Sequence, residues 1–416
     1  MKIYLSRAIA LSTVLVTTAC QNPITSSRQP LKLGSLLPVT GDASSIGENL
    51  PEAASLAVNT INACGGVNGT AVELVQTDSK TDPNAGAAAM SKLVTEEVAG
   101  VVGAWSSGVS SVAVEIAVKN EVMQISPGST SPDFTDRAQR GEFDGYWART
   151  VPPDTYQAQA LAQLAYDKGF DRVSTIVIDN SYGIGFEQEF VQSFKQLGGT
   201  VVNENNPVRY DPNPSSLDSE VSAIFADEPE AVLGVFYGQT GTLFLRSAYE
   251  QGLSQNVTPL LTDGVYSQEF VDNVGKTENN ESILKGALGT VPGASGAGLA
   301  GLTEKWQEKV GKPVTAFVPH TWDAAILMML AAEFANENTG AAIKNNLREV
   351  ANAPGQKVSD PCLAMQLIRD GEEINYQGAS GDLEFDQYGD TVSAYDVWQV
   401  EAQGEINLIE QVIPFR

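Results

Sequence analysis

The sequence predicts an α/β protein of two doubly wound lobes, in which helices cover both faces of a parallel sheet. From Leu31 onward, short β-rich runs alternate with segments of helical spacing, as expected for repeated strand–helix units. A second series begins after Val151-Pro152-Pro153, which breaks regular structure and suits a crossing between lobes. The chain has 416 residues, 42% of them hydrophobic and 18% charged, so it can bury more than one core.

The first series is expected to form the first part of lobe 1, residues 31–150. Strands are predicted at 31–37, 71–77, 100–105 and 122–125. Helical spacing places Ala54, Ala57 and Ile61 on one face before a stop at Gly65. Further helices are predicted at 84–98 and 109–116.

The second series is expected to form lobe 2, residues 151–288. Its predicted strands are 173–178, 231–237 and 257–261, and its helices are 155–168, 215–226 and 242–251. The run 286–291 should carry the chain back to lobe 1, whose second part is 289–390 with helices at 302–310, 321–335 and 341–350. The stretch 363–413 is expected to be rich in short strands and turns, and 391–416 should add strands to lobe 2 and the hinge.

The first 30 residues predict export. Lys2 and Arg7 precede an uncharged run at 8–19, so 1–19 has the pattern of a secretory signal, too short for the roughly 20 residues that span a bilayer. Cys20 follows a stretch similar to the lipobox of bacterial lipoproteins, although Thr17 departs from it. We expect a periplasmic protein that is either lipid-anchored at Cys20 or cleaved and freely soluble, with 20–30 as a tether.

The net charge of the chain excludes some classes of binding partner. Lys and Arg number 25 against 51 Asp and Glu, and the formal net charge of -26 repels nucleic acid and anionic lipid. We expect a monomer that touches a membrane only through its possible N-terminal lipid.

If Cys20 carries lipid, Cys64 and Cys362 remain as one pair, expected to form a disulfide in an oxidising compartment. The alternative is two buried free thiols.

The sequence contains few of the residue combinations that catalytic, metal or cofactor sites require. His320 is the one histidine, no G-x-S-x-G elbow accompanies it, and we expect it to be a structural residue with its hydrogen bonds satisfied. One histidine and at most two free cysteines cannot build a tetrahedral zinc site. The string 296–301 matches G-x-G-x-x-G but lacks the strand–turn–helix context, so a turn of small residues is expected. We therefore predict no enzyme, no metal and no cofactor.

Three loops that follow predicted strands could hold a small ligand instead. Loop 103–108 and loop 126–132 are rich in serine hydroxyls and backbone amides, which favour a carboxylate. Asp263 follows the strand 257–261 directly and precedes Gly264, so it could pair with a cation. Each loop is equally well explained as a cap or turn, and Asp263 as an Asx-type turn residue facing solvent.

The order of these motifs resembles the type I periplasmic binding proteins, and most closely the leucine/isoleucine/valine-binding branch that serves ABC importers. The resemblance covers nearly all of the mature chain and rests on 36–42, 62–69, Asp78 with Asp82-Pro83, 103–108, 125–132, Tyr182-Gly183, 322–324 and 380–389. It implies two lobes joined by a multi-crossing hinge, with an amino acid bound between them. It also implies a permease as partner, which recognises the closed form.

The resemblance assigns roles to individual residues. Ser107, with backbone groups of Gly128 and Thr130, would hold an α-carboxylate, while Thr130 and Asp263 would hold an α-ammonium. Tyr182 would close over the ligand. Trp105 and Phe236 would form walls, although core packing explains each as well. The predicted ligand-binding set is Trp105, Ser107, Gly128, Ser129, Thr130, Tyr182, Phe236 and Asp263.

Three departures from the family pattern leave the identity of the bound amino acid undecided. Ile46 stands where family members often have an aromatic residue, the segment 237–241 is short, and the acidic anchor is Asp263 in place of glutamate. Neutral or aliphatic amino acids are the expected ligands. The alternatives are a binding protein for urea, short amides or betaines, and a sensing module for a membrane receptor.

Overall fold

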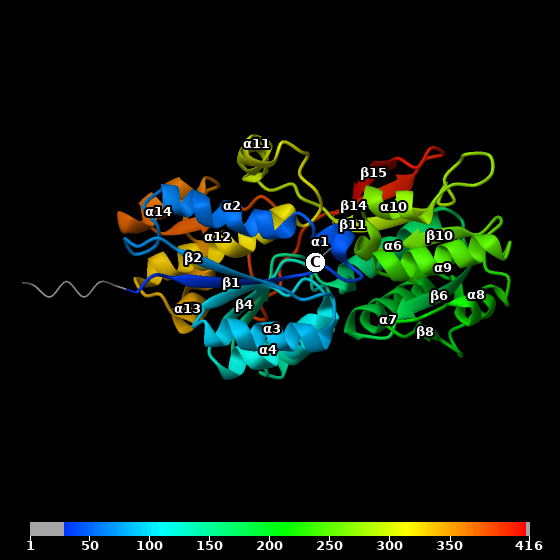
Figure 1. Ribbon diagram of the computed structural model, residues 1–416, viewed down its shortest axis with the longest axis horizontal. Coiled ribbons are helices and arrows are strands. Elements are labelled where there is room, and N and C mark those ends of the chain that lie inside the picture. Colours follow the sequence, from blue (N-terminus) through cyan, green and yellow to red (C-terminus); the bar gives the residue numbers. More distant parts are fainter. Residues whose placement is uncertain (1–28, 413–416) are drawn as a thin grey trace, which may run out of the picture.

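A computed structural model describes residues 29–412 as two α/β lobes lying side by side (Figure 1). The expected signal sequence 1–19, Cys20 and most of the expected tether 20–30 lie outside the described residues. Within 29–412, no helix is both long and apolar enough to cross a membrane.

Lobe 1 is built on a sheet of five parallel strands in the order β2-β1-β3-β4-β5. The inner strands β1 and β3 are buried along nearly their whole length, as expected for strands covered by helices on both faces. The strands are β1 Lys32–Leu37, β2 Glu73–Asp78, β3 Gly100–Gly103, β4 Met123–Ser126 and β5 Trp147–Arg149.

Helices cover both faces of this sheet (Figure 1). Helices α3 and α4 lie together on one face, while α2 and α12 pack against each other on the other, with α13 and α14 beside α12. Helix α12 is buried along most of its length, and apolar residues lie on all of its sides. The helices of this lobe are α1 Ser44–Gly47, α2 Leu50–Ala63, α3 Pro83–Thr95, α4 Ser107–Lys119, α5 Asp133–Gln139, α12 Val318–Ala335, α13 Gly340–Ala351 and α14 Pro361–Arg369.

Lobe 2 has a larger sheet in the order β15-β14-β11-β10-β9-β6-β7, with β8 also paired to β6. The pairs among β6 to β11 are parallel, whereas β14 runs antiparallel to β11 and to β15. The strands are β6 Arg172–Ile178, β7 Thr200–Val201, β8 Val208–Tyr210, β9 Ala231–Val235, β10 Thr258–Leu261, β11 Leu288–Pro292, β14 Tyr395–Val400 and β15 Ile406–Val412.

Helices α6 and α7 pack together in lobe 2, and α9 packs with α8 and α10. The helices are α6 Asp154–Asp167, α7 Ser181–Gln196, α8 Asp218–Phe225, α9 Gly238–Glu250, α10 Gln268–Val274 and a short 3-10 turn, η1, at Asp263–Val265. The remaining elements are α11 Leu299–Val310 and a small parallel pair of strands, β12 Gln356–Val358 and β13 Ile374–Tyr376.

Two expectations need correction. The expected end of lobe 2 at residue 288 is too early, because β11 pairs with β10 and β14 and keeps the chain in the second sheet as far as Pro292. The stretch 363–413 is not only strands and turns, because its first residues belong to helix α14. That helix starts with Asp360, whose side chain accepts from the Leu363 amide, and with Pro361 in its first turn.

The chain crosses between the lobes at 150–153, 293–298 and 377–394. The second and third crossings lie against each other, since the Gly298 amide donates to the Gly378 carbonyl at 2.9 Å. A Cβ on Gly296 would lie 2.1 Å from the Gly378 carbonyl oxygen, so only glycine fits there. The glycine-rich string 296–301 is therefore part of the hinge and the start of α11.

Asp323 of α12 fixes the third crossing to lobe 1. Its carboxylate accepts from the Ala379 amide at 3.0 Å, and from the amide and hydroxyl of Ser380 at 2.7 and 2.6 Å. Burial raises the pKa of Asp323 to about 6, and these hydrogen bonds only partly offset that effect.

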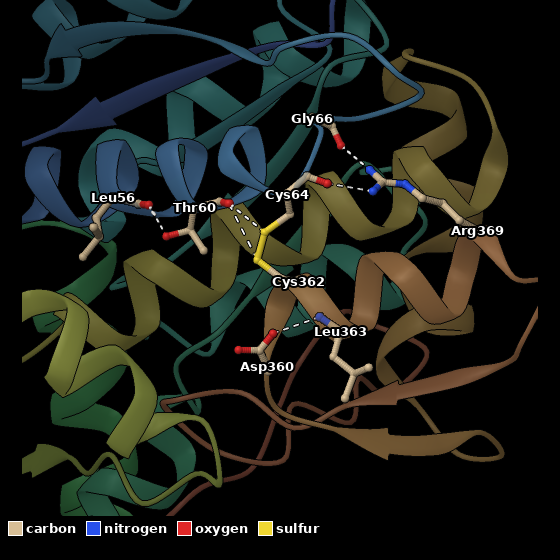
Figure 2. The surroundings of a disulfide bond; sticks show 8 residues. All are labelled: Leu56, Thr60, Cys64, Gly66, Asp360, Cys362, Leu363 and Arg369. Atoms are coloured by element: carbon tan, nitrogen blue, oxygen red, sulfur yellow. Dashed lines mark hydrogen bonds between the residues drawn. A yellow bond between two sulfur atoms is a disulfide. The ribbon is translucent and has the colours of Figure 1, made fainter.

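A disulfide joins Cys64, which caps α2, to Cys362 in α14 (Figure 2). The two residues are 298 positions apart in sequence, and their Cα atoms are 5.6 Å apart. Nearby, the Arg369 guanidinium donates to the carbonyls of Cys64 and Gly66 at 2.8 and 2.6 Å. The bridge thus ties the first part of lobe 1 to the part that returns after lobe 2.

Candidate functional site

The candidate site lies where the carboxyl ends of the two sheets face each other. In parallel α/β sheets, ligands bind at these ends because the loops there are free to vary and the helix N-termini point toward them. In lobe 1, Trp105 and Ser107 follow β3, and loop 127–132 follows β4. In lobe 2, Tyr182 follows β6 and Asp263 follows β10.

Asp263 is buried at this junction, with 2% of its surface exposed. The Tyr182 hydroxyl donates to Asp263 Oδ1 at 2.9 Å, and Gln157 Nε2 donates to the same oxygen at 3.0 Å. Burial raises the pKa of Asp263 to about 6, and these two donors partly offset the shift. Among residues 29–412, no lysine, arginine or histidine forms an ion pair with it. The alternative of a turn residue facing solvent does not hold.

Ser107, Gly128 and Thr130 belong to lobe 1, Ser107 at the start of α4 and the other two in the loop after β4. The Ser107 hydroxyl accepts from the Ser131 amide at 3.3 Å. Gly128 lies flat against Trp105, since a Cβ there would be 2.1 Å from the indole Cδ1. The Thr130 hydroxyl and the Trp105 indole N–H are both buried, and neither has a partner among the described residues. Such groups need a hydrogen bond, which a ligand could provide.

Ser129 has a different role from the expected one. Its hydroxyl contacts Ser110 Oγ at 2.8 Å and the carbonyls of Ala104 and Trp105 at 3.1 and 3.2 Å. Its amide donates to Ser126 Oγ at 2.8 Å. Both polar groups of Ser129 therefore bind the protein, and the residue shapes the loop without offering its hydroxyl to a ligand.

Three aromatic rings meet between the lobes. Tyr182 and Tyr237 stack with centroids 5.6 Å apart, and Tyr237 lies 5.8 Å from Trp105 of the opposite lobe. The expected wall residue Phe236 is instead fully buried within lobe 2, against Tyr210 and Phe244. Neighbouring residues at the end of β9 point in opposite directions, so Tyr237 occupies the place assigned to Phe236.

Two residues at the start of α6 were missed by the sequence analysis. Asp154 and Gln157 are one helical turn apart and fully buried. The Asp154 amide donates to the Thr130 carbonyl at 2.8 Å, which places Asp154 beside the ligand loop of lobe 1. Burial and the charge of neighbouring Asp263 raise the pKa of Asp154 well above its ordinary value. An aspartate in the first turn of a helix is common, so sequence alone gave no distinctive signal.

A buried arginine fixes the loop after β4. Arg149, with no exposed surface, pairs with Asp390 at 2.6 Å. Its guanidinium also donates to the carbonyls of Ser129 and Ser131 at 3.1 and 2.9 Å, and to the Thr135 hydroxyl at 2.8 Å. Arg149 thus orients the backbone on both sides of Thr130 and connects it to the third crossing.

The lobes are closed on each other. The Ser131 hydroxyl donates to the Ser181 carbonyl at 2.8 Å, and Asp42 accepts from the Gln239 amide of the other lobe at 2.6 Å. A cleft of about 570 Å³ runs along this junction and reaches Ser106 and Tyr237, whereas Asp263, Ser107 and Thr130 are not among the residues that line it.

His320 is buried and neutral, and burial lowers its pKa to about 3. The expectation of satisfied hydrogen bonds does not hold, because neither ring nitrogen has a partner among the described residues. Its ring lies 5.8 Å from that of Phe317.

Within 29–412, no group of three or more His, Cys, Asp or Glu side chains is placed to hold a metal ion.

Comparisons with known proteins show the family of the chain. A family described as "Receptor family ligand binding region" matches residues 49–403. The chemotactic signal transduction system substrate-binding protein BasB of Halobacterium salinarum is 27% identical over 388 residues, which cover 90% of this chain and 88% of that protein. The Leu/Ile/Val-binding protein homolog 1 of Brucella melitensis biotype 1 is 25% identical over 385 residues, covering 90% and 92%. The family and these relatives are binding proteins, not enzymes.

Solved structures share the fold. A leucine binding protein from Thermotoga maritima has a TM-score of 0.76 and 24% identity, covering 92% of this chain and 99% of that one. The branched-chain amino acid transporter substrate binding protein of Streptococcus pneumoniae, in complex with isoleucine, has a TM-score of 0.74 and 21% identity, covering 93% and 100%. A solute binding protein from R. palustris, in complex with benzoate, has a TM-score of 0.72 and 18% identity, covering 93% and 97%.

Proposed function

Because the chain belongs to the family of receptor ligand-binding regions and has the type I periplasmic binding fold, we propose that it is the substrate-binding protein of an ABC importer. Its ligand is a neutral or aliphatic amino acid bound between the lobes. The observation that carries this proposal is Asp263, a buried carboxylate with no cationic partner among residues 29–412.

A zwitterionic ligand would be complementary to Asp263 in lobe 2 and to the hydrogen-bond donors at the start of α4 in lobe 1. Its ammonium would pair with Asp263, since a charge taken out of water needs an opposite charge or strong hydrogen bonds. Its carboxylate would lie at the start of α4, where the Ser107 hydroxyl and the Thr130 amide offer donors next to the positive end of the helix dipole. The Gly128 amide already donates to Ser126 Oγ at 3.3 Å. Trp105, Tyr182 and Tyr237 would enclose an apolar side chain.

Three other ligand classes fit less well. Benzoate, the ligand of the R. palustris neighbour, brings a negative charge and no cation, so it would leave Asp263 uncompensated. Urea and short amides carry no charge to pair with Asp263. A quaternary betaine has the charge but no N–H to donate.

A thermal-shift screen tests the proposal with the twenty amino acids, urea, glycine betaine and benzoate. A ligand present at 100 times its Kd adds about 2.7 kcal/mol to the unfolding free energy, so a true ligand is easily seen. Stabilisation by neutral amino acids is the expected result. Stabilisation by benzoate or urea alone, with no amino acid active, would overturn the proposal.

Delivery to a permease and anchoring through Cys20 belong to the same proposal. Wild-type precursor should fractionate with membranes, and Cys20→Ser should release it or block its maturation. Full recovery of the wild type in the soluble periplasmic fraction would contradict anchoring.

A sensing role is the second candidate, favoured by the likeness to the chemotactic protein of Halobacterium salinarum. Amino-acid uptake that survives deletion of the gene, together with lost chemotaxis, would favour sensing.

A further inference from the structure

The start of helix α7 in lobe 2 lies against lobe 1, where α4 and α7 are in contact (Figure 1). The carbonyl of Ser181, the first residue of α7, accepts from the Ser131 hydroxyl at 2.8 Å, and the hydroxyls of Ser181 and Ser111 are 3.1 Å apart. Gly185 lies one turn further along α7, on the same face as Ser181, because residues four apart are neighbours on a helix surface. How closely the lobes can meet therefore depends on what Gly185 presents to lobe 1.

In the closed form there is no room for a side chain at Gly185. A Cβ there would lie 2.8 Å from Cδ and 3.8 Å from Cγ of Pro132, and 3.1 Å from Ser131 Oγ. Apart from its chain neighbours and the backbone of its own helix, these are the three nearest heavy atoms, and all belong to lobe 1. Non-bonded carbon atoms are most stable about 3.5–4.0 Å apart, so the contact with Cδ would be repulsive. This clash is between the lobes and disappears when they separate.

Pro132 is not free to move away from Gly185. Its Cδ belongs to the ring that is closed on the backbone nitrogen, so no side-chain rotation removes it. The carbonyl of Ser131 accepts from the buried Arg149 guanidinium at 2.9 Å, and the hydroxyl of Ser131 accepts from the Asp133 amide at 3.3 Å. The backbone around Pro132 is thus fixed within lobe 1.

Gly238, the first residue of α9, also faces lobe 1 but would tolerate a methyl group better. The nearest atom to a Cβ there would be Ser45 Oγ at 2.9 Å, followed by the Asp42 carbonyl oxygen at 3.2 Å. The Ser45 hydroxyl has no hydrogen-bond partner among the described residues, so it can rotate away without losing a contact. Gly185 meets a rigid ring instead, and closure should be more sensitive to a side chain at this position.

We infer that Gly185 controls closure of the lobes: the missing side chain lets α7 meet lobe 1, and a methyl group at this position holds the lobes apart. Gly185 is not among the residues assigned to the ligand, so its substitution acts on the equilibrium between open and closed forms. A protein held in the open form binds its ligand more weakly, because binding then includes the free energy of closing. Closure is common to every ligand of the junction, so the inference goes beyond the proposed function and does not depend on it.

A cross-linking experiment measures closure without any ligand. In a variant with Ser111→Cys and Ser181→Cys, the two thiols can meet only when the lobes close, so the rate of disulfide formation with oxidised glutathione reports the closed population. Mass spectrometry distinguishes the new linked peptide from the native bridge between Cys64 and Cys362. Addition of Gly185→Ala to this cysteine pair should slow cross-linking at least tenfold.

Two further variants separate closure from a local disturbance of α7. Gly301→Ala is the matched control, because Gly301 is also helical, in α11, and a Cβ there would meet nothing within 4 Å. It should leave the cross-linking rate unchanged. Pro132→Ala removes the ring atoms that the methyl group would meet, so it should restore the rate in the Gly185→Ala protein. The melting temperature of Gly185→Ala should not fall, because alanine favours a helix more than glycine does.

Isothermal titration calorimetry with glycine, L-alanine, L-leucine and L-phenylalanine adds the effect on affinity. Each probe that binds the wild type should bind Gly185→Ala at least tenfold more weakly and Gly301→Ala equally well. The inference is overturned by a Gly185→Ala cross-linking rate within twofold of the parent pair, by a lack of rescue with Pro132→Ala, or by a parent pair that forms no cross-link. If none of the four probes binds, the proposed function fails, while the cross-linking rates still decide the role of Gly185.

Discussion

The carboxylate of Asp42, in lobe 1, accepts a hydrogen bond of 2.6 Å from the backbone amide of Gln239, in the first turn of α9 in lobe 2. The same carboxylate accepts from the amide and hydroxyl of Thr240 at 3.1 and 2.8 Å. The first amides of a helix have no partner within it, so a carboxylate there acts as a cap. Here the cap comes from the opposite lobe and can form only when the lobes are closed.

Asp42→Ala should therefore favour the open form. A lost cap costs about 1 kcal/mol, which corresponds to about fivefold weaker ligand binding when closure and binding are coupled. Calorimetry gives the affinity, and small-angle scattering of the ligand-free protein should show a larger radius of gyration. Asp82→Ala is the control, because Asp82 caps α3 within lobe 1 by accepting from the Ala85 amide at 2.7 Å. It should lower the melting temperature without changing affinity.

Asp323 should make stability fall as pH rises from about 4 to about 6. Its pKa is raised from 3.8 to about 6 in the folded protein, so over this window the folded state holds a proton that the unfolded chain has lost. Deprotonation then costs the folded state up to about 3 kcal/mol, and this contribution is complete above the folded pKa. Urea unfolding at several pH values should show a smaller decline in Asp323→Asn than in the wild type. Equal slopes would contradict the prediction.

Arg149→Met should strongly destabilise the protein. The change leaves Asp390 buried without its partner, which typically costs about 3–5 kcal/mol. It also frees the carbonyls of Ser129 and Ser131, so ligand affinity should fall in the fraction that remains folded. Arg140→Met removes an arginine from an exposed ion pair and should leave the unfolding free energy almost unchanged. A similar small effect at Arg149 would contradict the prediction.

Removal of the disulfide should weaken lobe 1 but spare the site. Cys64→Ser with Cys362→Ser releases a link between residues 298 positions apart, and loss of such a bridge typically costs about 2–5 kcal/mol. Neither cysteine lies at the junction of the lobes, so the Kd of the bound amino acid should stay within about twofold. Denaturant unfolding and calorimetry measure the two quantities. Unchanged stability would mean that the bridge is not formed in solution.

The overall architecture follows from sequence periodicity, but the details of the site do not. Alternating apolar β-branched runs and helical spacing predict most of the parallel strands because both faces of those strands are buried. Short elements such as α5 and β7 have too few residues to show a period. The end of lobe 2 was misplaced because β11 is held by pairing with β14, more than 100 residues later, and no local signal reports that pairing.

For the expected site residues, the resemblance points to chain segments and leaves the direction of each side chain open. Tyr237 and Phe236 are adjacent aromatic residues at the end of β9, and only the local backbone decides which one faces the junction. Ser129 and Thr130 show the same ambiguity in the loop after β4. In the sequence Asp154 looks like an ordinary first-turn aspartate, and only the structure shows that its buried oxygens have no hydrogen-bond partner among the described residues.

The division of lobe 1 into two stretches of chain also affects how the protein is made. The sheet of this lobe is complete at Arg149, but the helix that packs against α2 on one of its faces begins only at Val318. A ribosome adding about 5–20 residues per second needs on the order of ten to thirty seconds to cover that interval. During this time the apolar side of α2 is without its cover, whereas most of lobe 2 is synthesised in one piece. The core of lobe 1 can therefore be completed only after most of lobe 2 has been added to the chain.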